Sequence, residues 1–229
     1  MEVNEIYARI GSLCVVPVIA IENPDAALPL ADALLEGGLP IAEITFRTAA
    51  AAAVIEKIAK QRPGILLGAG TLLNIENLRR AAECGATFGV APGFNPDIVC
   101  EALKIGFPFS PGIMTPSDIE GALSLGAKVL KFFPAGAAGG VKMLRSISAP
   151  YAHLGVRFLP TGGIHPNNMK EYLEEKSVLA VGGTWVATRE DIAAARWNTI
   201  RDNCRSALTA VEQLKDATHE GVKFHGTGS

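Results

Sequence analysis

The chain has 229 residues, of which 48% are hydrophobic and 19% charged, and its formal net charge is −2. This apolar content supports a sizeable core and excludes wholesale disorder. The near-neutral charge argues against a nucleic-acid-binding protein, because phosphate contacts need clustered Lys and Arg. No apolar run approaches the roughly 20 residues that a membrane helix needs, so we expect no membrane partner.

The four cysteines show no CxxC spacing, and the four histidines show no HxH or HExxH spacing. A dedicated metal site is therefore poorly supported, and we expect reduced and buried cysteines. The N-terminal segment 1–12 carries charges of both signs and has no signal-peptide apolar region. We expect a cytoplasmic protein.

Short apolar runs recur along the chain at intervals of roughly 20 to 29 residues, which suggests strands alternating with helices. The eight runs cover 14–20, 41–46, 64–70, 87–93, 107–113, 128–134, 157–163 and 179–185. Because they are apolar on both faces, they suit parallel strands covered by helices.

Helical patterns lie between the runs and after the last of them. The clearest cover 24–38, 75–85, 118–126, 165–175 and 186–217, and the last one predicts one or two terminal helices. Asn74 suits the N-cap of one helix, and Thr115 or Ser117 suits that of another. A further helix is expected before the first strand, and 221–229 is expected to be a frayed tail.

No linker or composition break divides the chain, so residues 1–229 are expected to form a single domain. Eight strands with intervening helices predict a (β/α)8 TIM barrel. A doubly wound sheet is the alternative, although residues 21–24 carry no Gly-rich nucleotide loop. In a barrel, the active site lies at the C-terminal ends of the strands.

Lys131 is the strongest candidate for chemistry, because it lies in the apolar run 129–134. A charged amine is costly there unless it is paired or neutralised. Desolvation favours the uncharged amine, which is the form that a Schiff-base nucleophile needs. Two structural alternatives stay open: an outward side chain or a buried ion pair. Lys128 is the weaker candidate, because it begins the strand at the end away from the site.

Glu43, Thr45 and Arg47 alternate along one strand and are expected to face the same way. A carboxylate inside the barrel could accept a proton, and an Arg at the strand end could bind a substrate carboxylate. The alternative is that Glu43 and Arg47 pair with each other. Thr71 follows two glycines, which leave space for a ligand, but it could equally cap a helix.

Two Gly-rich segments end the seventh and eighth strands, 160–164 and 182–185. Phosphate-binding barrels often hold phosphate at these two loops on backbone N–H groups. Tight barrel packing is the alternative. Together with an amine, a carboxylate and an Arg, this pattern suits carbon–carbon bond chemistry next to a carbonyl of a phosphorylated substrate.

In these segments the sequence resembles the family of 2-keto-3-deoxy-6-phosphogluconate (KDPG) aldolase and 4-hydroxy-2-oxoglutarate (KHG) aldolase, which are class I pyruvate aldolases. The resemblance runs from about residue 14 to about residue 185. The matching segments are 17–19, 43–48, 67–71, 91–93, 131–135, 139–142, 160–164 and 182–185.

The resemblance implies Lys131 as the Schiff-base lysine and Glu43 as the general acid and base. The substrate-binding residues that it implies are Arg47, Thr71, Pro92, Phe133, Thr161, Gly162, Gly163, Gly183 and Thr184. Arg47 and Thr71 would bind pyruvate, and the late glycines with the Thr184 hydroxyl would hold phosphate. Two positions depart from close relatives: Thr184 replaces an expected Ser, and Gly136 stands where a Glu is common.

The resemblance also implies a homotrimer that uses no metal or organic cofactor and splits KDPG into pyruvate and glyceraldehyde 3-phosphate. The galactonate-derived epimer of the substrate is an alternative. A phosphosugar epimerase or isomerase is another, in which Glu43 shuttles a proton and Lys131 stabilises charge. A metal-dependent aldolase and a non-catalytic sugar-phosphate-binding barrel also stay open.

Overall fold

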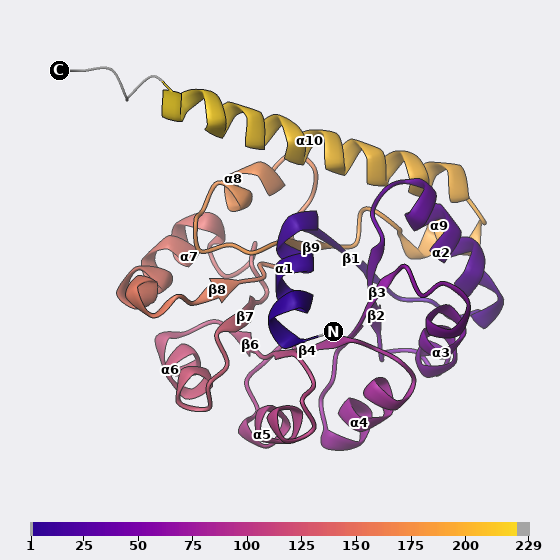
Figure 1. The fold of residues 1–229 in the computed structure, drawn as a ribbon, viewed down its shortest axis with the longest axis horizontal. Coiled ribbons are helices and arrows are strands. Elements are labelled where there is room, and N and C mark those ends of the chain that lie inside the picture. The colour runs from indigo at the N-terminus through magenta and orange to yellow at the C-terminus, as the bar shows by residue number, and fades with distance from the viewer. Residues whose placement is uncertain (1, 224–229) are drawn as a thin grey trace.

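The computed structural model describes residues 2–223 and has an α/β fold around a curled parallel sheet (Figure 1). The larger sheet has the order β5-β4-β3-β2-β1-β9, and the smaller has the order β6-β7-β8. The strands are β1 (Val15–Ile19), β2 (Ile41–Thr45), β3 (Leu66–Gly70), β4 (Phe88–Val90), β5 (Phe109–Ser110), β6 (Gly112–Ile113), β7 (Val129–Phe132), β8 (Arg157–Phe158) and β9 (Val181–Gly183). Every expected run contributes a strand, and all pairings are parallel.

Backbone contacts link the two sheets at both junctions. The run 107–113 was expected as one strand, but it forms β5 and β6 on either side of Pro111. Proline has no N–H to donate to a ladder, while the Pro111 carbonyl accepts the Lys131 N–H at 2.8 Å. At the other junction, Thr161 forms a parallel bridge with Gly182.

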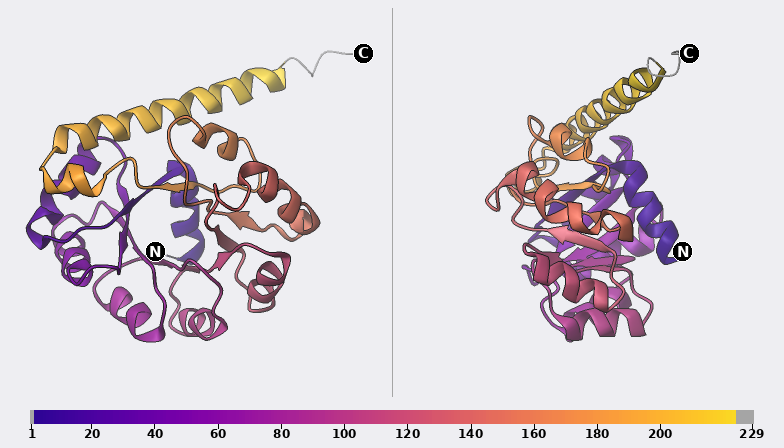
Figure 2. Two further views of the ribbon diagram at one scale, coloured as in Figure 1. Left: turned by 180° about the vertical axis from the view of Figure 1, so that it is seen from behind. Right: turned by 90° about the vertical axis from the view of Figure 1, so that its left-hand side faces the viewer.

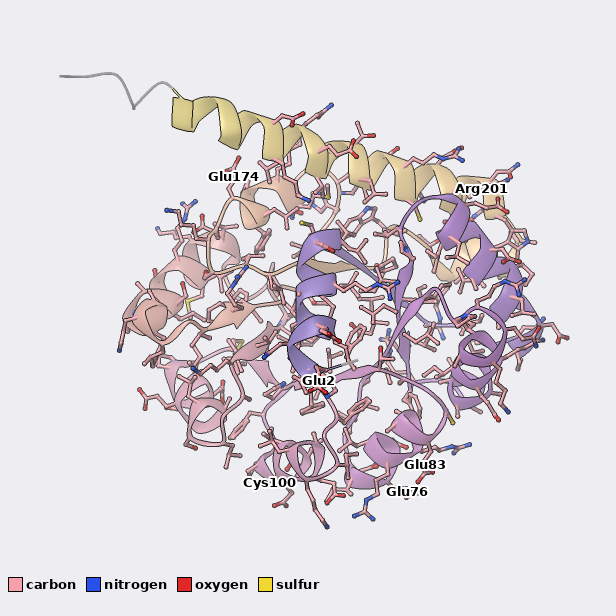
Figure 3. The ribbon with its side chains drawn as sticks, in the orientation of Figure 1. Glu2, Glu76, Glu83, Cys100, Glu174 and Arg201 are labelled. Carbon is pink, nitrogen blue, oxygen red and sulfur yellow. The ribbon has the colours of Figure 1, made fainter. Side chains whose placement is uncertain are left out.

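Helices surround the strands, as Figure 1 shows. They are α1 (Val3–Leu13), α2 (Ala27–Glu36), α3 (Ala51–Gln61), α4 (Ile75–Glu83), α5 (Pro96–Lys104), α6 (Pro116–Ser124), α7 (Gly140–Ser148), α8 (Met169–Leu173), α9 (Arg189–Ala193) and α10 (Trp197–Lys223), with 3-10 helices η1 (Pro24–Ala26) and η2 (Ala149–Leu154). Apolar side chains between strands and helices form the core. The expectation of buried cysteines is correct for Cys204 and wrong for the others, since Cys100 is exposed and Cys14 and Cys84 are half-buried. Charged side chains such as Glu76, Glu83, Glu174 and Arg201 lie along the outer edge of the helices (Figure 3).

Side-chain caps begin several helices where the sequence indicates them. Asn74 accepts the Asn77 N–H at 2.8 Å at the start of α4. Thr115, rather than Ser117, caps α6, and Asp118 accepts the Thr115 N–H in return. These contacts satisfy N–H groups that a helix leaves unpaired at its first turn.

The expected helical segments differ in detail from those observed. Only Met169–Leu173 of 165–175 is α-helical, because the Asn168 side chain bonds the His165 N–H and forms a turn first. The pattern 186–217 divides into α9 and α10, and α10 continues to Lys223. The first three residues of the expected frayed tail, 221–229, therefore belong to α10, and the rest lies outside the described residues.

The two ends of the strands differ. Helix α1 lies across their N-terminal end (Figure 2), where the Tyr7 hydroxyl contacts Ser110 Oγ at 3.2 Å and burial raises the pKa of Tyr7 to about 12. The C-terminal end carries the loops that follow the strands. No helix within residues 2–223 is long and apolar enough to cross a membrane.

Helix α10 joins the end of the chain to its beginning. It packs along α2, so closely that a Cβ placed on Gly37 would lie 2.6 Å from that of Cys204. Arg201 forms an ion pair with Glu36 at the end of α2. The last helix therefore covers the first helix that follows a strand.

Candidate active site

A cavity of about 230 Å³ lies at the C-terminal ends of the strands. All eleven residues that the sequence singles out line it: Glu43, Arg47, Thr71, Pro92, Lys131, Phe133, Thr161, Gly162, Gly163, Gly183 and Thr184. Val18, Thr45 and Ile164 complete the wall. The fold thus brings together residues that are separated by up to 141 positions in the chain.

Lys131 points inward and pairs with Glu43 across the cavity floor. Its Nζ lies 3.1 Å from Oε1 and 3.3 Å from Oε2 of Glu43, and the two side chains are 8% and 5% exposed. Nζ also lies 5.9 Å from the centre of the Phe133 ring. An outward Lys131 is therefore excluded, and Glu43 pairs with Lys131 rather than with Arg47. At this distance one proton can pass from the amine to the carboxylate.

The glycines of β3 provide space for side chains of the neighbouring strands. Gly70 lies beside Thr45 in the sheet register, and a Cβ on Gly70 would come within 1.9 Å of Glu43 Oε1. A Cβ on Gly68 would likewise meet the Phe88 ring at 2.2 Å. The prediction that these glycines leave space for a ligand is therefore wrong in its detail, since protein side chains fill that space.

Arg47 and Thr71 lie at the mouth of the cavity. The Arg47 side chain is exposed and makes no hydrogen bond or ion pair with any residue in 2–223. Thr71 adopts a φ of 56°, a left-handed conformation that is costly for a β-branched residue, by about 1–3 kcal/mol. It does not cap α4, because Asn74 does. Strain of this kind is often found at binding sites.

The two Gly-rich turns also line the cavity. Gly162 and Gly163 have φ values of 91° and 76°, which favour glycine. Gly183 lies under the Trp185 ring, where a Cβ would come within 1.5 Å of it. Gly136 packs against the 162–163 turn, and its N–H donates to the Gly162 carbonyl at 2.8 Å. The glycine at 136 thus allows close contact between two loops.

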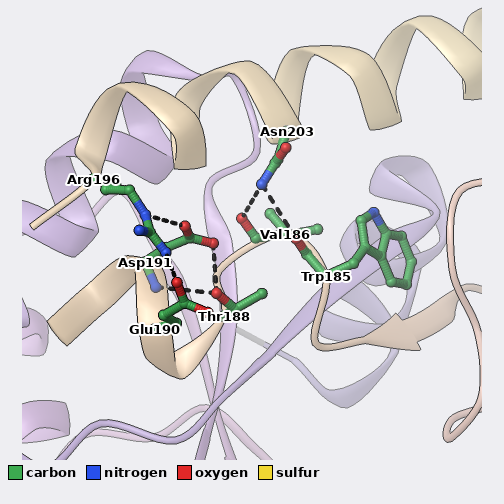
Figure 4. A network of polar contacts seen from close by, with 7 residues as sticks. All are labelled: Trp185, Val186, Thr188, Glu190, Asp191, Arg196 and Asn203. Carbon is green, nitrogen blue, oxygen red and sulfur yellow. Dashed lines mark hydrogen bonds and ion pairs between the residues drawn. The ribbon is translucent and has the colours of Figure 1, made fainter. Parts of the chain in front are cut away.

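The loop after β9 is fixed from α9 and α10 (Figure 4). Asn203 Nδ2 donates to the carbonyls of Trp185 and Val186, each at 3.2 Å. In the same region Asp191 accepts hydrogen bonds from Thr188 and Arg196, and the Thr188 hydroxyl is the main reason that the pKa of Asp191 falls below its usual value. Sequence reasoning missed Asn203, which carries no local signal in its helix.

Thr45 is the other residue without a predicted role. It was expected to share a face with Glu43 and Arg47, and it does line the cavity. It is 1% exposed, and its Oγ1 has no hydrogen-bond partner among the described residues. A buried hydroxyl in this state is uncommon in folded proteins.

A second cavity, of about 280 Å³, lies at the opposite end of the strands. Its wall is mostly apolar and includes Lys128 and Tyr7. Lys128 therefore lies away from Glu43, as its place at the start of the strand predicts. Within residues 2–223 no group of three or more His, Cys, Asp or Glu side chains could hold a metal ion.

The family model described as "Aldolase: KDPG and KHG aldolase" matches residues 6–203. The chain belongs to this family. It is 44% identical over 206 residues to the 2-dehydro-3-deoxy-phosphogluconate aldolase of Treponema pallidum, covering 90% of this chain and 97% of that protein. It is 41% identical over 194 residues to the KHG/KDPG aldolase of Escherichia coli K12, covering 85% and 90%. The resemblance seen in the sequence is thus confirmed.

Solved structures of aldolases in this family have the same fold. The KDPG aldolase of Legionella pneumophila, with pyruvate captured as a covalent carbinolamine intermediate, superimposes with a TM-score of 0.85 at 35% identity, over 90% of this chain and 98% of that one. The aldolase of Zymomonas mobilis ZM4, with 3-phosphoglycerate, gives 0.80 at 38% identity, over 90% and 94%.

Proposed function

We propose that this protein is a class I aldolase that cleaves KDPG into pyruvate and glyceraldehyde 3-phosphate through a Schiff base on Lys131. It also cleaves KHG, to pyruvate and glyoxylate. The single observation that carries the proposal is the buried contact between Lys131 Nζ and the Glu43 carboxylate, 3.1 Å apart at the floor of the cavity. The names of the Treponema and Escherichia relatives support the choice of substrates.

The reaction begins when Lys131 transfers a proton to Glu43. The neutral amine attacks the C2 carbonyl of the substrate and forms a carbinolamine. Glu43 then returns its proton to the C2 hydroxyl, which leaves as water, and an iminium remains. The 3.1 Å contact and the low exposure of both side chains place the donor and the acceptor of this proton side by side and away from bulk solvent.

Carbon–carbon cleavage uses the same pair. Glu43, again a carboxylate, takes the proton of the C4 hydroxyl through a water molecule. The C3–C4 bond breaks, its electrons pass to the iminium, and glyceraldehyde 3-phosphate leaves. Glu43 protonates C3 of the resulting enamine, and hydrolysis of the iminium releases pyruvate. No metal or organic cofactor takes part in this scheme.

The mouth of the cavity orients the substrate. Arg47 has no protein partner in the described residues and is free to bind the C1 carboxylate, with the Thr71 hydroxyl beside it. Pro92 and Phe133 enclose the reacting carbons. The phosphate lies at Thr161, Gly162, Gly163, Gly183 and Thr184, where glycine lets backbone N–H groups approach an anion closely.

Borohydride trapping tests the proposal. Sodium borohydride added with pyruvate should inactivate the enzyme and add the mass of a reduced pyruvate to the peptide that contains Lys131. Lys131→Met should abolish both effects, and Lys128→Met, in the opposite cavity, should leave both unchanged. The absence of an adduct, or an adduct on Lys128, would refute the mechanism. Hydrogen exchange at C3 without pyruvate release would favour an isomerase instead.

The phosphate position is tested at Thr184. Thr184→Val removes the hydroxyl and retains the shape, so it should raise KM for KDPG by about tenfold, the effect of one lost charge-assisted hydrogen bond. KM for KHG, which has no phosphate, should stay within about twofold. Equal effects on the two substrates would place the phosphate elsewhere. The galactonate-derived epimer belongs in the same series, since the two phosphorylated substrates differ only at C4.

The proposal includes the assembly. We expect a single domain over residues 1–229, a barrel closed by the Thr161–Gly182 and Pro111–Lys131 backbone contacts, a homotrimer in solution and a cytoplasmic location. Light scattering during size-exclusion chromatography measures the oligomer directly. A monomer or dimer at micromolar concentration would contradict the trimer while leaving the chemistry intact.

A further inference from the structure

Thr45 is the one described side chain of the cavity wall with a fully enclosed and unpartnered hydroxyl. It lies in β2 between Glu43 and Arg47, on the face that both of those residues share. Leaving a buried hydroxyl without a partner destabilises a folded protein, and natural proteins rarely retain such a group without a use for it. Because Thr45 lines the cavity, a molecule bound in the cavity can supply the missing hydrogen-bond partner.

The position of Thr45 suits a partner that also touches Glu43. Residues two apart on a strand are separated by roughly 6.6 Å along the chain, and their side chains rise side by side. One water molecule can bridge two oxygen atoms that lie up to roughly 5.6 Å apart, since each O–H···O contact spans roughly 2.8 Å. The Glu43 side chain is longer than that of Thr45, so its carboxylate can lean along the strand and close the difference. Thr45 χ1 has three staggered positions, and the bridge requires the one that turns the hydroxyl toward the cavity.

We propose that Thr45 is a positioning residue, whose hydroxyl holds the water through which Glu43 exchanges the C4 proton. This inference rests on the proposed aldolase function and assigns a residue to one step of it. The water is the molecule that leaves C2 when the iminium forms. Thr45 retains it beside the Glu43 carboxylate instead of letting it escape to the cavity mouth.

The protons balance in this scheme. Glu43 donates a proton to the C2 hydroxyl, which becomes water and leaves the iminium behind. That water then accepts the C4 hydroxyl proton while it passes one of its own to the Glu43 carboxylate. The C3–C4 bonding electrons move to the iminium and form the enamine, and the water is unchanged. Thr45 neither gains nor loses a proton.

The test compares cleavage with reactions that do not use the bridging water. Thr45→Val has the same shape and lacks the hydroxyl, and Thr45→Ser retains it. Thr87→Val is the matched control, because the Thr87 hydroxyl already donates to the Leu67 carbonyl at 2.9 Å at the other end of the strands. For each variant, kcat and KM for KDPG, borohydride trapping of pyruvate and deuterium exchange of the pyruvate methyl group are measured.

We expect Thr45→Val to lower kcat for cleavage by about tenfold or more. Its KM, its trapping rate and its methyl exchange should stay within about threefold of wild type, because Glu43 protonates C2–OH and C3 directly in those steps. Thr45→Ser should restore kcat to within about threefold, and Thr87→Val should leave it unchanged.

Three results would overturn the inference. An unchanged kcat in Thr45→Val would mean that the hydroxyl has no role in cleavage. A raised KM with unchanged kcat would mean that it binds the substrate instead. Equal losses of cleavage and methyl exchange would indicate a general disturbance of the site. Failure of the wild-type enzyme to form the pyruvate adduct would instead refute the proposed function itself.

Discussion

Gly70→Ala displaces the Glu43 carboxylate without altering any residue that touches the substrate in the proposed scheme. The new Cβ would lie 1.9 Å from Glu43 Oε1. An ordinary contact needs about 3.4 Å, so the carboxylate must move by about 1.5 Å. That shift is half of the 3.1 Å distance to Lys131 Nζ. A misplacement of about 1 Å can cost a factor of about 100 in rate, so we expect kcat to fall at least 100-fold.

The fold should survive this substitution, because the atoms that the new methyl group meets belong to the Glu43 side chain rather than to the backbone. The loss of the buried pair should lower the free energy of unfolding by up to about 3 kcal/mol. The assay is pyruvate release coupled to lactate dehydrogenase, with urea unfolding followed by circular dichroism.

Gly64→Ala is the matched control. It lies just before the same strand, and its Cβ would meet Leu35 Cδ2 at an ordinary 3.7 Å. It should keep wild-type kcat. A folded Gly70→Ala enzyme with kcat within about threefold of wild type would refute the reasoning, because a catalytic carboxylate could not then occupy the position beside Gly70.

Two predictions concern the loop after β9. Asn203→Ala removes the donor that holds the Trp185 and Val186 carbonyls. It should raise KM for KDPG more than for KHG and lower the free energy of unfolding by about 1–2 kcal/mol. Equal changes in the two KM values would mean that Asn203 does not help to position the phosphate-binding loop. Asp191→Asn should lower the free energy of unfolding by about 1–2 kcal/mol at pH 7. Because the Thr188 hydroxyl and Arg196 hold the pKa of Asp191 below its usual value, this contribution is fully present above about pH 4 and is lost as pH falls through the lowered pKa. Urea unfolding at pH 7 and pH 3 checks this, and a difference between wild type and variant that persists undiminished at pH 3 would contradict it.

The alternation of strands and helices could be predicted, because it depends on local patterns. The order of apolar runs and the caps at Asn74 and Thr115 are properties of a few neighbouring residues. The direction of Lys131 could not be predicted in the same way. Its strand is apolar on both faces, so alternation alone leaves inward and outward positions equivalent. The pairing of β7 with β6, in which Lys131 lies beside Gly112, fixes the choice.

Some features of the site could not be predicted from the sequence, because they depend on contacts between segments that are far apart in the chain. Gly70 is a glycine because of Glu43, which lies on a different strand. Asn203 acts on a loop from a helix on the outside of the molecule. The alternation along the strand predicts that Thr45 faces the same way as Glu43 and Arg47. It does not show whether the Thr45 hydroxyl has a hydrogen-bond partner, because that depends on the residues around it in the fold.

The packing of α10 on α2 has a consequence for biosynthesis. The ribosome makes α2 about 160 residues before it begins α10, which at roughly 5–20 residues per second is a delay of about 8 to 32 seconds. During that time α10 has not been made, so the surface around Gly37 that later packs against Cys204 is exposed to solvent. A nascent chain stalled before Trp197 should therefore be a better chaperone client than the released polypeptide.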